Sequence, residues 1–458
     1  MRDFKIVCLM TVARAGSKLF QSLLDGHPQI ICFPRTLRFD TFWQSTAHKK
    51  ADPGYIVDEF IRLDPRFFDG RKWSLINKFD KADELGENRD QTFIVDTSEF
   101  RRLALKQIGE TKLTRAHLFL SLHMAYHLAS GRQLPKNGLI LYHIHDTCLE
   151  SELAACLEDF PDQTSVIMTT RHPLSGLTSV TKWMEMQNIV SFGGLLFYTR
   201  TALTDAHDLM QNFPGLNLRV VPLEKLNRQH ESHMRALTSW AGIDWNDSLM
   251  TPTMHGMLWL GNAKTSKGHT DPNFPQFSPN GFLERKDERF FCTLFPGRME
   301  RYGYLKPPER NDHTFSSVTL YLAPLLPTAN GWAIFVSSIN PVFWWRTYLN
   351  VKSETFTRLR DYADNKTTRL NQISSDKIHL ERKSSLSLHL KTLRQLFMRM
   401  VWTNPAVGFY MYLRRARTQY EWIRKTRHNP EQPPMILYEE NRSNTFSDKK
   451  QRLKQRPT

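Results

Sequence analysis

The chain of 458 residues has few cysteines, and they are not arranged for metal or disulfide chemistry. The five cysteines are scattered, odd in number and never spaced as Cys-x-x-Cys. This argues against a zinc site and a disulfide framework and predicts a cytoplasmic protein, because disulfides persist in oxidising compartments. The chain also lacks low-complexity tracts and internal repeats, so its length predicts a folded protein with two domains, or one domain with an appendage.

Acidic residues are scarce in the last third of the chain. Residues 306–458 hold 26 lysines and arginines against 12 aspartates and glutamates, which leaves only +2 of the total net charge of +16 for residues 1–305. With Pro307 and Pro308 at the junction, this asymmetry divides the chain into a near-neutral body, residues 1–305, and a basic extension, residues 306–458. Such a segment indicates an anionic partner, either a membrane surface or a nucleic acid.

The basic extension has no uninterrupted apolar run suited to crossing a bilayer. Residues 314–345 are uncharged and long enough, but prolines and asparagines interrupt them. Further on, apolar residues recur at helical spacing over 386–401, and aromatic residues mix with arginines over 409–427. Amphipathic helices of this composition bind anionic membrane surfaces, so we predict a peripheral membrane contact and no nucleic-acid partner. The alternative, that these helices pack on the body and the basic side chains face solvent, stays open.

Strand-like apolar runs alternate with helices in the body. The pattern predicts strands over 4–12, 138–145, 165–170 and 216–226, and helices over 17–24, 150–161 and 233–241. Between about 37 and 135 the pattern is mostly helical and rich in aromatic residues. Alternating strands and helices form parallel sheets covered on both faces. We therefore predict an α/β fold: a P-loop-like parallel sheet flanked by helices, with a mostly helical insert and a helical basic C-terminal extension.

The first predicted strand runs into a small, basic turn that opens a helix. The turn consists of Arg14, Ala15, Gly16, Ser17, Lys18 and Leu19. It is not a Walker A loop, because that motif requires GxxxxGK[ST] and here the lysine follows the glycine by two positions. Its backbone N–H groups, its serine hydroxyl and its two cations are instead suited to hold an anion at a helix N-terminus. An ordinary strand–helix turn with surface basic residues is the alternative.

A second cationic position follows the third predicted strand. Arg171 comes directly after "IMTT", where a nucleotide triphosphatase would carry a carboxylate for Mg²⁺, and Ser179 lies eight residues further on. A helix starting near residue 174 brings the serine within reach of an anion that the arginine holds. Arginine suits a terminal phosphate because its planar fork donates two hydrogen bonds at once.

These motifs, in this order, resemble the sulfotransferases. "RAGSKLFQSLLDGHP" is similar to their 5′-phosphosulfate loop, and Arg171 with Ser179 resembles their 3′-phosphate site. "FPDQTSVIMTTRHPLSGLTS", "RVVPLEKL" and "LTSWAGIDW" resemble later segments of the family, so the resemblance covers Lys5 to Gly303. It implies a P-loop-like α/β fold that binds 3′-phosphoadenosine 5′-phosphosulfate (PAPS) without a metal. Lys18 and His172 depart from the family pattern, in which Ser or Thr and Asp or Asn stand there.

The resemblance also implies the chemistry: a sulfuryl group moves from PAPS to a hydroxyl-bearing acceptor, which is a carbohydrate, a lipid or another small molecule. Arg14 and Lys18 would then meet the negative charge that grows on the leaving phosphate. The catalytic base implied is His145, in "YHIHD", with His143 or an acid of the insert such as Glu99 as alternatives. A lysine-bearing loop over 258–274 resembles the family's cofactor lid and adds Lys267 to the predicted PAPS contacts.

Two other classes of function stay open. A P-loop-type small-molecule kinase shares the strand–loop–helix opening, although the Walker A spacing and the metal-binding carboxylate are missing. A non-catalytic membrane or nucleic-acid adaptor would use the basic extension alone.

Overall fold

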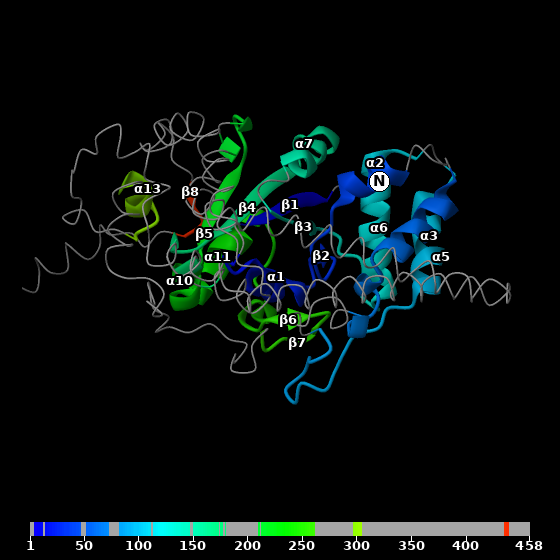
Figure 1. Ribbon diagram of the computed structural model, residues 1–458, viewed down its shortest axis with the longest axis horizontal. Helices are drawn as coiled ribbons and strands as arrows, with labels where there is room; N and C mark the ends of the chain where they lie inside the picture. The colour runs from blue at the N-terminus through cyan, green and yellow to red at the C-terminus, as the bar shows by residue number, and fades with distance from the viewer. Residues whose placement is uncertain are drawn as a thin grey trace, which may run out of the picture.

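Six parallel strands form the central sheet of the computed structural model, in the order β2-β3-β1-β4-β5-β8 (Figure 1). Their bounds are β1 Lys5–Thr11, β2 Ile30–Cys32, β3 Leu139–Asp146, β4 Thr164–Thr170, β5 Leu218–Pro222 and β8 Met435–Ile436. The structure describes residues 4–11, 14–46, 52–72, 82–110, 113–146, 150–173, 175–176, 179, 209–210, 212–261, 296–304 and 435–438.

Strand β1 lies at the centre of the sheet and is apolar on both faces. Ile6 and Cys8 contribute to one core cluster, and Val7 and Leu9 contribute to the other. Because helices cover both faces of a parallel sheet, a central strand is a continuous apolar run and not an alternating one. This explains why "IVCLM" is buried throughout.

The two faces are covered by different helices. Helices α1 and α11 contribute to the core on the Val7 face, and α7 with the insert contributes to the core on the Ile6 face. The bounds are α1 Ser17–Asp25, α7 Glu150–Asp159, α10 Leu223–Arg228, α11 His230–Ala241 and α13 Pro296–Arg301. A 3-10 turn η2 (Asp247–Met250) and a two-stranded hairpin, β6 (Thr253–Met254) with β7 (Met257–Leu258), follow α11.

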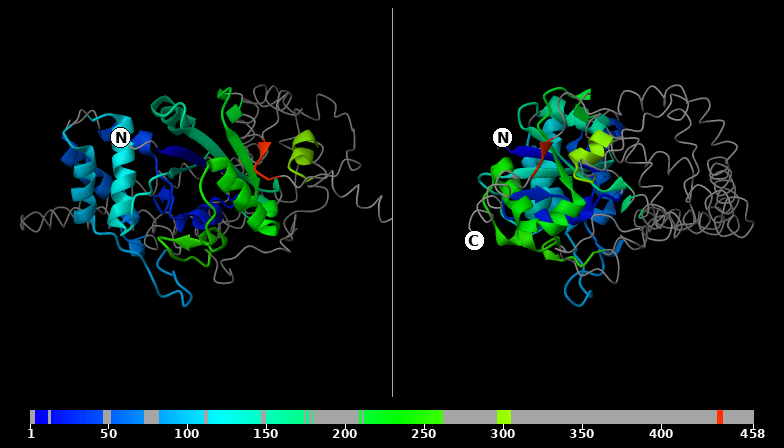
Figure 2. Two further views of the ribbon diagram at one scale, coloured as in Figure 1. Left: turned by 180° about the vertical axis from the view of Figure 1, so that it is seen from behind. Right: turned by 90° about the vertical axis from the view of Figure 1, so that its left-hand side faces the viewer.

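The insert predicted over 37–135 is mostly helical, as expected. It contains α2 (Phe39–Thr46), α3 (Pro53–Leu63), the 3-10 turn η1 (Pro65–Phe67), α5 (Thr97–Ile108) and α6 (Arg115–Ala129). Asp52 and Asp96 begin α3 and α5, each by accepting hydrogen bonds from the backbone N–H groups of the first turn. The insert helices gather at the β2 end of the sheet, away from α13 and β8 (Figures 1 and 2).

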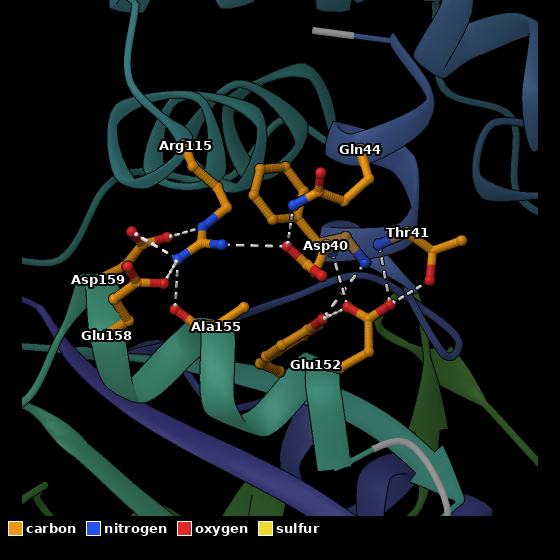
Figure 3. Close-up of polar contacts among 10 residues, drawn as sticks. Asp40, Thr41, Gln44, Arg115, Glu152, Ala155, Glu158 and Asp159 are labelled. Atoms are coloured by element: carbon orange, nitrogen blue, oxygen red, sulfur yellow. Dashed lines mark hydrogen bonds and ion pairs between the residues drawn. The ribbon is translucent and has the colours of Figure 1, made fainter. Parts of the chain in front are cut away.

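Polar contacts fix the insert to α7 (Figure 3). The Arg115 guanidinium bonds to Asp159 (Nε–Oδ2 2.7 Å) and to Asp40 at the start of α2 (Nη1–Oδ1 3.1 Å). Glu152 of α7 accepts hydrogen bonds from the backbone N–H of Asp40 at 2.7 Å and of Thr41 at 3.0 Å. The carboxylate of Glu152 thereby satisfies N–H groups at the N-terminus of α2, which would otherwise be orphaned. The chain that leads from β2 into the insert is therefore held in one position.

Three segments differ from the sequence-based prediction. Strand β2 was not predicted, because three residues are too few to show a period. The predicted strand over 216–226 ends at Pro222, which has no N–H for a further ladder bond, and residues 223–226 belong to helix α10. Strand β8 comes from the basic extension and pairs with β5.

Other predictions lie outside the described residues. These are the helices of the extension, most of the loop over 258–274 with Lys267, and the domain boundary at 305. Among the helices that the structure does describe, none combines the length and apolar character needed to span a bilayer.

Candidate active site

Three of the predicted elements of the site, the turn of residues 14–19, Arg171 and His145, lie at the carboxyl end of the central strands. Strand β1 pairs with β3 on one side and with β4 on the other, so the loops that follow β1 and β4 diverge there. In open parallel sheets this divergence creates the crevice in which ligands bind. The turn of residues 14–19 follows β1, Arg171 follows β4, and His145 lies near the end of β3.

The turn after β1 has the backbone shape of an anion cradle. Arg14 and Gly16 both adopt left-handed conformations, with φ of 67° and 84°. A Cβ at Gly16 would lie 2.5 Å from Leu223 Cδ1 and would also be strained by the positive φ, so glycine is favoured at this position. Helix α1 begins at Ser17 with no acidic residue in its first turn. Its N-terminal N–H groups and the positive end of its dipole therefore favour an anion.

The structure brings Arg171 and Ser179 together with this turn. Arg171 Nη1 donates to the Arg14 carbonyl oxygen at 3.3 Å, and Arg14 Nε donates to Ser179 Oγ at 3.0 Å. The Nε of Arg171 is buried and has no hydrogen-bond partner among the described residues. A buried guanidinium N–H without an acceptor is costly, so this atom is suited to an anionic ligand.

A buried carboxylate supports the segment that carries Arg171. Glu224 Oε1 accepts a hydrogen bond from the His172 N–H at 2.9 Å, and its Oε2 accepts one from the Tyr304 hydroxyl at 3.1 Å. Burial raises the pKa of Glu224, and these hydrogen bonds oppose the rise. The backbone after β4 is thus fixed by a residue of α10, which the sequence-based reasoning had missed.

Lys18 lies in a surplus of positive charge. Burial, and after it the charges of Arg35, Arg14 and Arg66, together lower the pKa of its ammonium to about 7. A lysine in the first turn of a helix also opposes the helix dipole. These effects would all be offset by an anion bound at the turn.

Two histidines approach the site from β3. The register between β1 and β3 shifts between Leu9 and Met10, and His145 at this irregularity has a positive φ of 77°. The rings of His143 and His145 lie 5.6 Å apart, centroid to centroid. His145 is half-buried, whereas His143 is buried.

The tautomer of His143 follows from its neighbours. Gln21 Nε2 donates to the Phe33 carbonyl oxygen at 2.7 Å, which orients Gln21 Oε1 toward His143 Nδ1 at 2.6 Å. Nδ1 must therefore carry the hydrogen, and the buried Nε2 carries the lone pair with no partner among the described residues. Burial first, and then the charges of His145, Lys18 and Arg35, lower the pKa of His143 well below its usual value. His143 is therefore a neutral ring.

Two cationic residues of this region were not predicted. Arg35 follows β2, and Arg66 lies on η1 in the insert. The sequence does contain a feature that could have located Arg35: the short apolar run "IICFP" directly before it indicates the end of a buried strand. Glu99, the alternative base, forms a solvent-exposed ion pair with Arg102 on α5 (Oε1–Nη2 2.6 Å). Within the described ranges, no three His, Cys, Asp or Glu side chains form a metal-binding group.

A parallel α/β sheet with a cationic turn after its central strand is the architecture of a P-loop-like anion-binding fold. The chain belongs to the sulfotransferase family, whose profile matches residues 7–247.

Among solved structures, the chain is similar to the sulfotransferase domain from the Synechococcus PCC 7002 olefin synthase, with 15% identity, 71% of this chain and 95% of that chain covered and a TM-score of 0.36. It is also similar to the sulfotransferase domain from the curacin biosynthetic pathway, with 13% identity, coverage of 66% and 98% and a TM-score of 0.37. A third similar structure is the sulfotransferase STF9 from Mycobacterium avium, with 13% identity, coverage of 54% and 66% and a TM-score of 0.29. No curated protein matches the chain.

Proposed function

We propose that this protein transfers a sulfuryl group from PAPS to a hydroxyl group of a carbohydrate, a lipid or another small-molecule acceptor. The observation that carries this proposal is the convergence of Arg171, Ser179 and the turn after β1 on one end of the sheet. Family membership makes sulfuryl transfer the expected reaction class.

The residues present fit the two phosphate groups of PAPS. Arg171, with its buried Nε, and Ser179 would hold the 3′-phosphate. The N–H groups of residues 15–19, with the Ser17 hydroxyl, would hold the 5′-phosphosulfate at the start of α1. Lys267, in the loop over residues 258–274, is proposed as a further contact to PAPS.

PAPS supplies an activated sulfuryl group. Arg14 and Lys18 would place positive charge beside the bound phosphosulfate, where it would stabilise the negative charge that develops on the leaving phosphate. A sulfuryl group carries less charge than a phosphoryl group, so side-chain cations can stand where kinases use Mg²⁺.

His145 is proposed to accept the proton of the acceptor hydroxyl, and His143 is the alternative. Both come from β3, which lies between β1, the strand that precedes Arg14, and β2, the strand that precedes Arg35. A neutral imidazole with a free lone pair is a suitable base near neutral pH. The neutral state of His143 meets this requirement, and the half-exposed position of His145 gives access to an acceptor.

Calorimetry with adenosine 3′,5′-bisphosphate and with ATP tests the proposal on the full-length protein. We expect the bisphosphate to bind and to displace ATP, and sulfuryl transfer to persist in EDTA. Tighter binding of ATP that depends on Mg²⁺ would support the kinase alternative, and binding of neither nucleotide would support the adaptor.

A further inference from the structure

The backbone beside Arg171 is held by side chains from two distant parts of the chain. The His172 N–H donates to Glu224 Oε1 at 2.9 Å, and the Tyr304 hydroxyl donates to Glu224 Oε2 at 3.1 Å. Glu224 lies on α10, and Tyr304 follows α13. The carboxylate is fully buried. It therefore joins α10 to two other segments, and one of these segments carries Arg171.

The His172 ring belongs to the same buried cluster. It meets the Tyr304 ring edge-on, with the two centroids 5.0 Å apart, and it is buried. Burial, and after it the charge of Arg171, lower the pKa of His172 to about 4, so the imidazole is neutral near pH 7. The histidine that departs from the family pattern at this position is therefore a packing group, and it adds to the contacts that fix this backbone.

The charge of Glu224 also acts on Arg171. Burial raises the pKa of Glu224, and the hydrogen bonds that it accepts and the positive charge of Arg171 oppose that rise. Because the interaction of two charges is mutual, the carboxylate attracts the guanidinium in turn. An ionised carboxylate is also a stronger hydrogen-bond acceptor than a neutral group. Glu224 is therefore suited to restrain both the backbone beside Arg171 and the charge of its side chain.

Arg171 is restrained at two points. Its Nη1 donates to the Arg14 carbonyl oxygen at 3.3 Å, and the next N–H along the chain is bound by Glu224. Its buried Nε has no partner among the described residues. A guanidinium that is fixed in this way loses little freedom when it binds an anion, and its affinity for the anion is correspondingly higher. A shift of the backbone at His172 would displace the Nε and remove this advantage.

Tyr304 lies beyond the part of the chain that the family profile matches, which is 7–247. Its N–H closes a turn after α13 by donating to the Met299 carbonyl oxygen at 2.7 Å. Met299, Tyr302 and Tyr304 are all buried in one core cluster. The position of the Tyr304 hydroxyl is therefore set by a packed segment, residues 296–304.

We propose that Glu224 and Tyr304 are positioning residues for the donor nucleotide: they hold the backbone beside Arg171 so that its guanidinium is oriented before the 3′-phosphate binds. They act through Arg171 and are not assigned a contact with the nucleotide. Recognition of the 3′-phosphate then depends on residues 296–304 as well as on the matched region. This assignment rests on the proposed function, because it concerns the binding of PAPS.

The test compares two nucleotides by calorimetry on the full-length protein. Adenosine 3′,5′-bisphosphate and adenosine 5′-phosphate differ only in the 3′-phosphate, so the ratio of their affinities isolates that contact. We expect the native protein to prefer the bisphosphate at least about tenfold, as one charge-assisted contact provides. In Glu224→Met most of this preference should be lost. The affinity for the 5′-phosphate should change less than about threefold, because that group is proposed to bind at the turn after β1.

Further variants separate positioning from general stability. Glu224→Gln keeps an acceptor for the His172 N–H and should retain the preference within about threefold. Tyr304→Phe keeps the ring beside His172 and removes the hydroxyl, so it should lower the preference less than Glu224→Met does. Adding Glu224→Met to Arg171→Ala should lower the preference no further. The matched control is Glu231→Met, since Glu231 is 56% exposed on α11, and it should leave both affinities unchanged.

Each outcome decides the proposal. A loss that is confined to the bisphosphate and absent when Arg171 is already alanine supports it. An unchanged preference in Glu224→Met, an equal loss for both nucleotides, or a further loss in the double variant overturns it. If thermal unfolding shows that Glu224→Met is not folded, Tyr304→Phe alone and combined with Arg171→Ala is judged by the same criteria. Binding of neither nucleotide by the native protein would instead refute the proposed function, and this assignment with it.

Discussion

Lys18 should take up a proton when an anion binds at the turn after β1. In the unliganded protein, burial and the charges of Arg35, Arg14 and Arg66 lower the pKa of the ammonium to about 7. A bound phosphate reverses the sign of the local field and favours the charged lysine, so its pKa rises toward the ordinary value of about 10.4. The lysine is therefore partly neutral before binding and charged afterwards.

The size of this effect follows from the lowered pKa. With a pKa of about 7, only about one molecule in eleven carries the Lys18 proton at pH 8, so binding should take up about 0.9 proton. At pH 6 nearly all molecules are already protonated at Lys18, and the uptake from this group should be close to zero. Between pH 6 and pH 8 the affinity should fall about tenfold, because protonation at pH 8 costs about 1.4 kcal/mol.

Calorimetry of adenosine 3′,5′-bisphosphate in two buffers of different ionisation enthalpy measures the number of protons taken up. Lys18→Arg is the matched control, because a guanidinium is charged at both pH values and should show no uptake at pH 8. Absence of uptake by the native protein at pH 8 would refute the lowered pKa of Lys18. Equal uptake by Lys18→Arg would assign the proton to another group, of which His143 is the nearest candidate by its charge coupling to Lys18.

Three further predictions concern the proposed 3′-phosphate contacts, the proposed catalytic base and the basic extension. Arg171→Ala should weaken binding of the bisphosphate about ten- to hundredfold, and Ser179→Ala should weaken it less, because it removes a single neutral donor; unchanged affinity in calorimetry would contradict the 3′-phosphate assignment. His145→Ala should abolish transfer in a radiolabelled PAPS assay without changing bisphosphate binding, whereas the same loss in His143→Ala would exchange the two roles. In a flotation assay, the full-length protein should bind anionic vesicles and not neutral ones, and changing the three arginines within 414–417 to glutamine should reduce this binding; flotation with neither vesicle would end the membrane prediction. Full-length chains are needed because β8 belongs to the sheet.

Short-range features of the fold could be predicted from the sequence. Each of these features depends on residues that are neighbours in the chain. The buried strand β1 follows from an apolar run, the turn after it from a glycine at a left-handed position, and the start of α1 from a helix-forming pattern. Arg171 and Ser179 could be predicted in the same way, because a strand end and the helix after it place residues eight apart on one site. The mostly helical insert was also apparent from its pattern.

Only the tertiary structure could decide which distant segments meet. The charges of Arg35 and Arg66 act on Lys18 because β2 joins the edge of the sheet and because Asp64, at the start of η1, bonds to both arginines. A strand of three residues, such as β2, is too short to show a periodic pattern in the sequence. The tautomer of His143 on β3 depends on Gln21 of α1, which the Phe33 carbonyl after β2 orients. Strand β8 pairs with β5 across more than two hundred residues of chain. These contacts arise from packing and strand pairing between segments that are far apart in the chain, whereas sequence periodicity records only how each segment folds by itself.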